Sequence, residues 1–220
     1  MNASYSVDMM GIIAHRGYWL DPSEKNTLTA FSRAFMNGFG VETDLRDFDG
    51  ELVISHDIPT AGAIKAFDLI KIHHLYPVYA PVALNIKADG LHGLIGAFIS
   101  QAKFKNAFVF DMAVPDMRAY IKNYTPTFTR LSEFEKEPAF LNACMGVWID
   151  AFETEWYCPS TINSLLNRNK QVAIVSPELH GRSHLPLWEL IRGHDFHRNN
   201  LVSICTDFPM QAKEYFYEQD

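Results

Sequence analysis

The run Val172-Ala173-Ile174-Val175 is apolar at every position. A strand with one solvated face alternates apolar and polar residues, whereas a continuous apolar run fits a strand buried on both faces. Strands of that kind are typical of parallel sheets, because helices cover both sides of such sheets. The run therefore predicts a parallel sheet at the centre of the fold.

Seven other segments carry a similar signature, and amphipathic segments alternate with them from end to end. The eight candidate strands are residues 11–14, 41–46, 82–86, 107–111, 127–131, 146–150, 172–175 and 202–205. Eight strand–helix units in 220 residues predict one domain over residues 1–220 with the α/β fold of a (β/α)8 TIM barrel, a fold that needs roughly 200 residues. A doubly wound open sheet is the second possibility.

The segments between these strands have helical spacing. In the first of them Leu28, Phe31 and Phe35 recur on one face, and Asn26 is expected to cap the helix. Further helices are predicted over 91–102, 115–124, 159–169, 185–192 and 209–217. Three of these begin at a proline, which the first turn of a helix tolerates.

Composition excludes several classes of protein. A net charge of −7 argues against a broad nucleic-acid surface, and no stretch approaches the roughly 20 apolar residues of a membrane span. Three scattered cysteines do not indicate a disulfide framework and suggest a reducing compartment. Residues 1–10 lack the pattern of a signal peptide, so we expect a cytoplasmic protein. The oligomeric state is not indicated.

Two acids in the second strand stand two positions apart. Glu42 and Asp44 therefore point to the same side, and at the carboxyl end of a barrel strand that side is the mouth, where such folds place their chemistry. Two adjacent carboxylates repel each other unless a cation lies between them. A hard divalent ion, Mg2+ or Ca2+, is the natural partner for these oxygen ligands.

Two histidines fall at the ends of different strands, about forty residues apart. His15 is followed by Arg16 and Gly17, and His56 follows a predicted hairpin that turns at Asp49-Gly50. Two imidazoles across a phosphate can divide the work of general acid and general base, and a guanidinium offers a planar fork for phosphate oxygens. These residues predict a catalytic site for a phosphorylated substrate.

The order and spacing of these groups resemble the glycerophosphodiester phosphodiesterase family of the PLC-like phosphodiesterase superfamily. The matching residues are Ala14-His15-Arg16-Gly17, Asn26-Thr27, Glu42-Thr43-Asp44 and His56-Asp57. The resemblance implies a metal-dependent hydrolase that cleaves a small or head-group phosphodiester, with His15, His56 and Arg16 as catalytic residues and Glu42 and Asp44 as metal ligands. It also implies that the family's small inserted subdomain, after His56, is largely absent here.

The match departs from the family pattern on the third barrel strand. The family has Glu-x-Lys, whereas this chain has Asn85-Ile86-Lys87, so a neutral amide replaces the third acidic ligand and Lys87 is left to bind a phosphate oxygen. Asp111 and Asp150, at the ends of later strands, could complete the metal site or could cap helices. The family's Pro-Glu-Asn-Thr is interrupted by an insertion, so the equivalence of Glu24 stays open.

Other polar residues receive weaker assignments. Glu178, His180 and Arg182 follow the seventh strand and are candidate substrate ligands, because phosphate sites in such barrels often use the loops after strands seven and eight. The segment 205–209 resembles the family's terminal Thr-Asp-x-Pro, and we expect Thr206 or Asp207 to cap the last helix. His73 is expected on the surface.

Three functions therefore remain open. The first is hydrolysis of a glycerophosphodiester-like substrate. The second is a transfer reaction, like that of phospholipase-D-like toxins, that stops at a cyclic phosphate formed by the substrate's own hydroxyl. The third is a non-catalytic barrel that binds a phosphorylated ligand.

Overall fold

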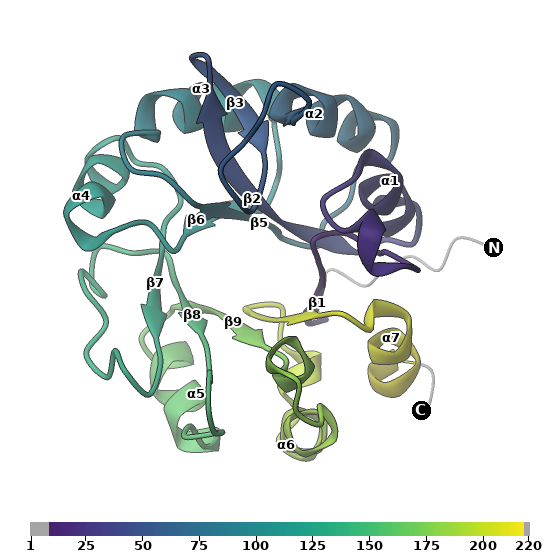
Figure 1. The fold of residues 1–220 in the computed structure, drawn as a ribbon. Helices are drawn as coiled ribbons and strands as arrows, with labels where there is room; N and C mark the ends of the chain where they lie inside the picture. The colour runs from purple at the N-terminus through teal and green to yellow at the C-terminus, as the bar shows by residue number, and fades with distance from the viewer. Residues whose placement is uncertain (1–8, 218–220) are drawn as a thin grey trace.

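The computed structural model describes residues 9–217, so residues 1–8, which carry most of the segment examined for a signal peptide, lie outside it. Eight parallel strands lie around one axis (Figure 1). In ring order they are β1 (Gly11–His15), β2 (Gly40–Phe48), β5 (Val82–Ile86), β6 (Ala107–Phe110), β7 (Phe128–Leu131), β8 (Gly146–Ile149), β9 (Gln171–Val175) and β10 (Val202–Thr206). All eight predicted strands are confirmed, and the arrangement is that of a TIM barrel.

One junction of the ring differs from the rest. Seven neighbouring pairs form parallel ladders, but β6 and β7 share only the isolated bridge between Val109 and Thr127. Inside the barrel the Phe108 and Phe128 rings stack across this junction, with centroids 3.7 Å apart. The sheet is therefore not closed by a continuous ladder, and an aromatic stack supplements the missing backbone pairing.

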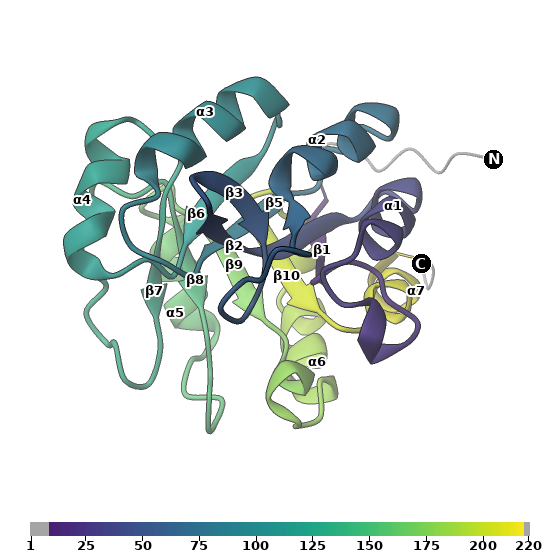
Figure 2. The same cartoon turned by 45° about the horizontal axis from the view of Figure 1, so that its top comes forward.

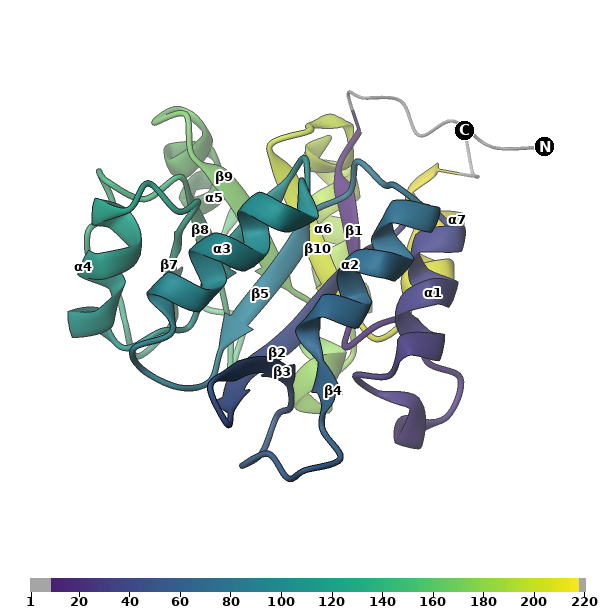
Figure 3. The same cartoon turned by 90° about the horizontal axis from the view of Figure 1, so that it is seen from above.

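Seven helices of residues 9–217 surround the strands (Figures 1 and 3). They are α1 (Leu28–Met36), α2 (Ala66–Leu75), α3 (His92–Ala102), α4 (Val114–Lys122), α5 (Pro159–Leu166), α6 (Leu185–Gly193) and α7 (Pro209–Tyr217). Six match predicted segments, whereas α2 was not predicted. The prediction of eight strand–helix units was wrong at one place, because residues 132–145, between β7 and β8, contain no helix.

The predicted hairpin is present (Figure 2). β2 continues past the barrel and pairs antiparallel with β3 (Glu51–Ile54) around Asp49-Gly50, and the two-residue strand β4 (Ile64–Lys65) follows. The Ser55 amide donates to the Asp44 carbonyl oxygen over 3.0 Å, which brings the chain back to the end of the barrel. The short connection from β3 to α2 leaves no room for a larger inserted subdomain.

Two apolar clusters form the core. The larger lies between the strands and the helices, and the smaller fills the barrel interior with Ile13, Ala83, Phe108, Phe110, Phe128, Trp148, Ala173, Val175 and Cys205. Four aromatic rings supply most of the interior volume, and small residues on other strands make room for them. This packed interior leaves chemistry to the rim.

Two expectations about single residues are corrected. His73 is not on the surface: its ring packs edge-on against Phe35 and Phe104, and burial lowers its pKa to about 4. Thr27, not Asn26, is the N-cap of α1, since its side chain accepts the Ala30 amide. No helix within residues 9–217 is long and apolar enough to cross a membrane.

Candidate active site

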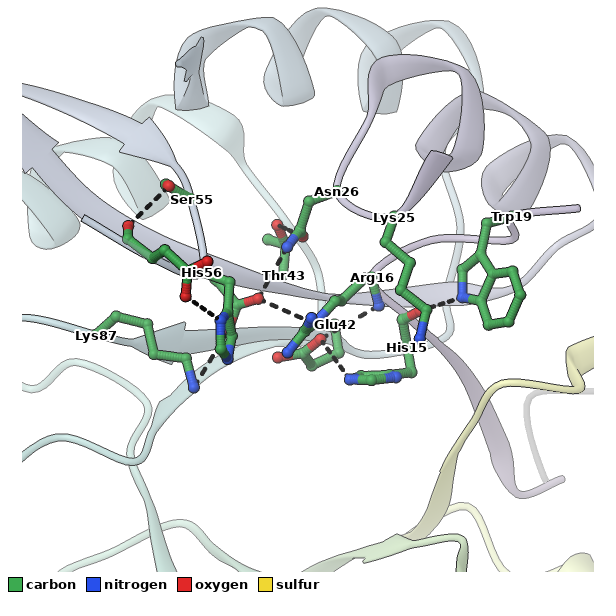
Figure 4. A network of polar contacts seen from close by, with 12 residues as sticks. His15, Arg16, Trp19, Lys25, Asn26, Glu42, Thr43, Ser55, His56 and Lys87 are labelled. Carbon is green, nitrogen blue, oxygen red and sulfur yellow. Dashed lines mark hydrogen bonds and ion pairs between the residues drawn. The ribbon is translucent and has the colours of Figure 1, made fainter. Parts of the chain in front are cut away.

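Strand register brings the predicted residues to one rim. His15 on β1 pairs with Glu42 on β2, and Asp44 pairs with Asn85 on β5. Residues two positions apart share a face, so all four continue the interior-facing rows that begin at Ile13 and Ala83. Figure 4 shows the side chains of His15, Glu42 and Lys87 turned towards the barrel mouth.

The chain turns sharply after β1. Arg16 and Gly17 both have positive φ, 56° and 87°, and the Gly17 amide donates to the Ala14 carbonyl over 3.1 Å. A Cβ atom at Gly17 would lie 2.8 Å from Ala30 Cβ, so only glycine fits against α1. The Arg16 amide then donates to Glu42 Oε2 over 3.2 Å, which fixes the arginine at the rim.

Asp44 is surrounded by cations and amide donors. Arg16 Nε lies 3.2 Å from Oδ2, Lys87 Nζ lies 3.3 Å from Oδ1, and the Asn26 amide donates to Oδ2 over 2.8 Å. The side-chain oxygen of Asn26, Oδ1, accepts from the Thr43 hydroxyl, so the Asn26 side chain is held at both its nitrogen and its oxygen. Asn26 is thus part of the site and does not cap α1, which explains why an αL conformation (φ 60°) is maintained there.

Glu42 is buried, with a side chain 3% exposed. Burial, reinforced by the charge of Asp44, raises its pKa to about 7, while His15, Arg16 and Lys87 act in the opposite direction. Glu42 therefore has less positive charge around it than Asp44 has. An additional cation beside it would lower the cost of ionising it.

His15 is held by Asp207, which the sequence indicated only as a candidate cap of the last helix. Its Nδ1 lies 2.7 Å from Asp207 Oδ1, and its Nε2 lies 3.9 Å from Glu42 Oε2. Burial acts to raise the pKa of Asp207, but the hydrogen bond and charge of His15, with Lys25 at 3.6 Å, lower it overall. Because an ionised carboxylate only accepts, Nδ1 carries the proton and Nε2 faces the mouth. The expectation that Asp207 serves only to cap a helix is corrected.

His56 lies at the same rim, one residue beyond the contact of Ser55 with Asp44. Its side chain is 47% exposed, and its Nδ1 lies 2.8 Å from Asp57 Oδ1. Arg46 donates to its carbonyl oxygen over 3.2 Å. In the view of Figure 4, Arg16 and Glu42 lie between the rings of His15 and His56.

The oxygen donors of Glu42, Asp44 and Asn85 suit a hard divalent cation. Asn85 Oδ1 and Asp44 Oδ1 are buried and have no hydrogen-bond partner among the described residues, although Lys87 pairs with Asp44. Within residues 9–217 no three His, Cys, Asp or Glu side chains form a ready-made metal site, and Asn85, beside Asp44 in the strand register, is the neutral candidate for a third ligand. The residues present therefore fit such an ion with two charged ligands and one neutral ligand.

The remaining candidates are engaged elsewhere. Asp111 pairs with Arg130 at 3.1 Å, and its role as a metal ligand stays a prediction. Asp150 binds His180 Nε2 at 2.7 Å and is not the N-cap of α5, which is Cys158. Glu24 pairs with Arg33 at 2.7 Å.

Two of the predicted substrate ligands have internal partners. Arg182 donates to the carbonyl oxygens of Ala151 and Phe152 and pairs with Glu155, so it fastens the β8 loop. Glu178 accepts from Thr206 and from the Asp207 amide. His180 also has an internal partner, Asp150, and its side chain is 24% exposed, the same fraction as that of Arg182. Substrate binding by these residues stays a prediction.

Solved structures with the same architecture were found. A candidate glycerophosphodiester phosphodiesterase of Galdieria sulphuraria has 14% identity and a TM-score of 0.72, over 96% of this chain and 99% of that one. The enzyme of Agrobacterium tumefaciens has 15% identity and a TM-score of 0.63, over 94% and 99%.

The fold is that of the glycerophosphodiester phosphodiesterases. A Ca2+-dependent phosphatidylinositol-specific phospholipase C of Streptomyces antibioticus has 11% identity and a TM-score of 0.53, over 94% and 96%. No protein-family model matches the chain, and no curated protein matches it. At these identities the glycerophosphodiester phosphodiesterase likeness concerns the fold, and it confirms the predicted resemblance at that level.

Proposed function

We propose that this protein is a phosphodiesterase that cleaves a small or head-group phosphodiester of the glycerophosphodiester class at the mouth of the barrel. The observation that carries this proposal is the convergence of His15, Arg16, Asp44 and Lys87 on one rim, with Arg16 and Lys87 both within 3.3 Å of one carboxylate. Two cations that converge on the two oxygens of one carboxylate can also converge on the oxygens of one phosphate group.

Arg16 and Lys87 would hold the non-bridging oxygens of the phosphate. The Arg16 backbone is fixed at both ends. Its N–H donates to Glu42, and its carbonyl oxygen accepts the backbone N–H of Asn26 over 2.9 Å, so the guanidinium is positioned before substrate arrives. Preorganised donors stabilise the charge that develops in the transition state without reorganising at that moment.

His15 would move a proton at Nε2. Asp207 holds the proton on Nδ1, which leaves Nε2 free to accept a proton from the attacking hydroxyl or water and to return it later. His56 would act on the opposite side of the phosphate, since it is more exposed and approaches from the β3 end. We leave open which histidine serves the leaving group.

Glu42, Asp44 and Asn85 would hold a divalent cation, Mg2+ or Ca2+. When bound, such an ion supplies positive charge to the phosphoryl oxygens. It would also stabilise the ionised form of Glu42, whose pKa is raised to about 7 by burial.

The test is a direct assay with glycerophosphocholine, glycerophosphoethanolamine and glycerophosphoglycerol, each with Mg2+, Ca2+ or Mn2+. We expect release of an alcohol and a phosphomonoester, a loss of at least a hundred-fold in H15A, and unchanged activity in H194A, because His194 is exposed at the far end of α6. Activity that survives H15A would refute the proposed mechanism.

Phosphorus NMR of the products separates hydrolysis from cyclisation. A cyclic ester that persists would make the protein a transferase of the same architecture. A specific observation favours the third possibility, the non-catalytic barrel: Asn85 supplies no charge to the metal site. Substrate binding with no turnover in any of the three metals would support it.

A further inference from the structure

Glu178 lies in the 3-10 turn Pro177–His180 that follows β9, and its carboxylate points back towards β10. Oε1 accepts the Thr206 hydroxyl and, over 3.1 Å, the Asp207 amide. Oε2 is buried and has no hydrogen-bond partner among the described residues. Glu178 is half-buried, and its carboxylate is directed at residues 206 and 207.

The segment that Glu178 contacts is the one that carries Asp207. The Thr206 hydroxyl also accepts the Phe208 amide over 3.0 Å, so one hydroxyl and one carboxylate fix three successive residues. Asp207 then extends Oδ1 to His15 at 2.7 Å and Oδ2 to Lys25 at 3.6 Å. A chain of contacts thus runs from Glu178 through Asp207 to the imidazole.

The base of this chain is rigid. The Ser176 amide donates to the Cys205 carbonyl over 2.9 Å, and the Ser176 hydroxyl, fully buried, accepts from Trp188 over 3.0 Å. Pro177 is buried, which restricts the backbone of the turn. Because Glu178 starts from a fixed backbone, its carboxylate can impose a position on the end of β10.

We propose that Glu178 is a positioning residue: it fixes the backbone at Asp207, and through the Asp207 carboxylate it holds the His15 ring with Nε2 facing the mouth. This inference rests on the proposed function for its effect on turnover. It replaces the substrate-binding role that the sequence suggested for Glu178. A displacement of about 1 Å in such a supporting residue is enough to lower turnover by orders of magnitude.

We expect the hydrogen bonds that Glu178 accepts, and not its negative charge, to hold Asp207 in place, so the variants remove the acceptor and the charge separately. E178Q keeps an oxygen that can accept from Thr206 and Asp207, whereas E178A removes it. T206V removes the hydroxyl at nearly constant volume and provides a second route to the same effect if E178A fails to fold. E189A, an exposed glutamate on neighbouring α6, is the matched control.

Two measurements are made on the full chain. The first is kcat and KM for the best substrate of the phosphodiester panel. The second is proton NMR of the His15 Nδ1–H, a downfield signal that is assigned by its loss in H15A and that requires no activity. We expect E178A and T206V to lower kcat about ten-fold with KM changed less than three-fold and to weaken the Nδ1–H signal. E178Q and E189A should retain both.

A double mutant tests whether the effect passes through Asp207. In a D207N background, E178A should lower kcat by less than a further two-fold, because the contact it supports is already lost. The inference would be overturned if the reductions in kcat from E178A and D207N multiplied in the double mutant. It would also be overturned if the Nδ1–H signal were unchanged in both E178A and T206V. If no substrate is turned over, the proposed function fails, and the NMR signal alone still decides whether Glu178 positions His15.

Discussion

The Asp207 carboxylate lies 2.7 Å from Nδ1 of His15, although 192 positions separate the two residues. β1 and β10 are adjacent in the ring, with Ala14 paired to Thr206, so the ends of the first and last strands meet at the same rim. Closure of the barrel therefore creates this pair, and the site depends on contacts between the two ends of the chain.

The first prediction concerns that pair. D207N keeps the size of the side chain but removes the charge, so Nδ1 is no longer held as a donor and the imidazole can adopt the other tautomer. We expect kcat/KM for the best phosphodiester substrate to fall about a hundred-fold, with the melting temperature within a few degrees of the wild type. Steady-state kinetics and calorimetry measure both; a loss below three-fold would contradict the assigned role of Asp207.

The second prediction concerns Asn85. N85E adds a charged oxygen beside Asp44, its neighbour in the β2–β5 register, and the number of charged ligands strongly affects the affinity for hard cations. We expect the affinity for Ca2+ and Mn2+ to rise on the order of ten-fold in titration calorimetry. N106D, an exposed Asn-to-acid change outside the site, serves as the control. Equal affinities in wild type and N85E would exclude residue 85 from the metal site.

The third prediction concerns pH. The pKa of Glu42 is raised from 4.5 to about 7 in the folded protein, so between these values the unfolded chain loses the proton while the folded chain keeps it. Below about pH 4.5 Glu42 is protonated in both states and does not change the free energy of unfolding. As pH rises from 4.5 to about 7 it lowers the free energy of unfolding, and above pH 7 this loss is constant.

E42Q, which cannot ionise, measures this effect. In the absence of divalent ions we expect the stability of E42Q relative to wild type to increase between pH 4.5 and 7 by about 2–4 kcal/mol. Denaturant unfolding at several pH values tests it, with E189Q as the control at an exposed position. A difference between E42Q and wild type that does not vary with pH would show that Glu42 is not protonated near neutrality.

The fourth prediction concerns Gly17. G17A must accommodate a Cβ 2.8 Å from Ala30 Cβ at φ 87°, whereas G181A meets nothing within 4 Å at φ 75°. We expect G181A to cost about 1 kcal/mol from backbone strain alone and G17A about 3 kcal/mol or more, because α1 must move. Chemical denaturation of both variants gives the difference; equal costs would mean that α1 yields freely at Ala30.

The sequence predicted what local pattern encodes. Continuous apolar runs such as Val172–Val175 identified the strands, and Glu42 and Asp44 were placed on one side by the period of a strand. The helix α2 was not predicted, and His73 within it was expected on the surface, whereas its ring packs between those of Phe35 and Phe104. Residues 132–145 lack a helix, a feature that the count of strand–helix units concealed.

Residues that act through distant contacts could not be predicted. Nothing near Asp207 in the sequence indicates His15, and Glu178 looked like a substrate ligand because its internal partners, Thr206 and Asp207, come from the next strand. Asn26 was expected to cap α1, and only the approach of β2 shows that its amide binds Asp44. Pairings of this kind depend on strand order, which no local spacing reveals.

The junction between β6 and β7 has a mechanical consequence. Where neighbouring strands share a ladder, separation breaks several backbone hydrogen bonds at once. Here the strands are joined by one bridge, a ring stack and the Asp111–Arg130 ion pair. Local opening of the barrel should begin between β6 and β7. Backbone amide hydrogens of β6 and β7 at this junction will therefore exchange with deuterium before those in the β1–β10 ladder. The half of the rim that carries His15 and Glu42 is built on β1 and β2, which share a ladder away from this junction.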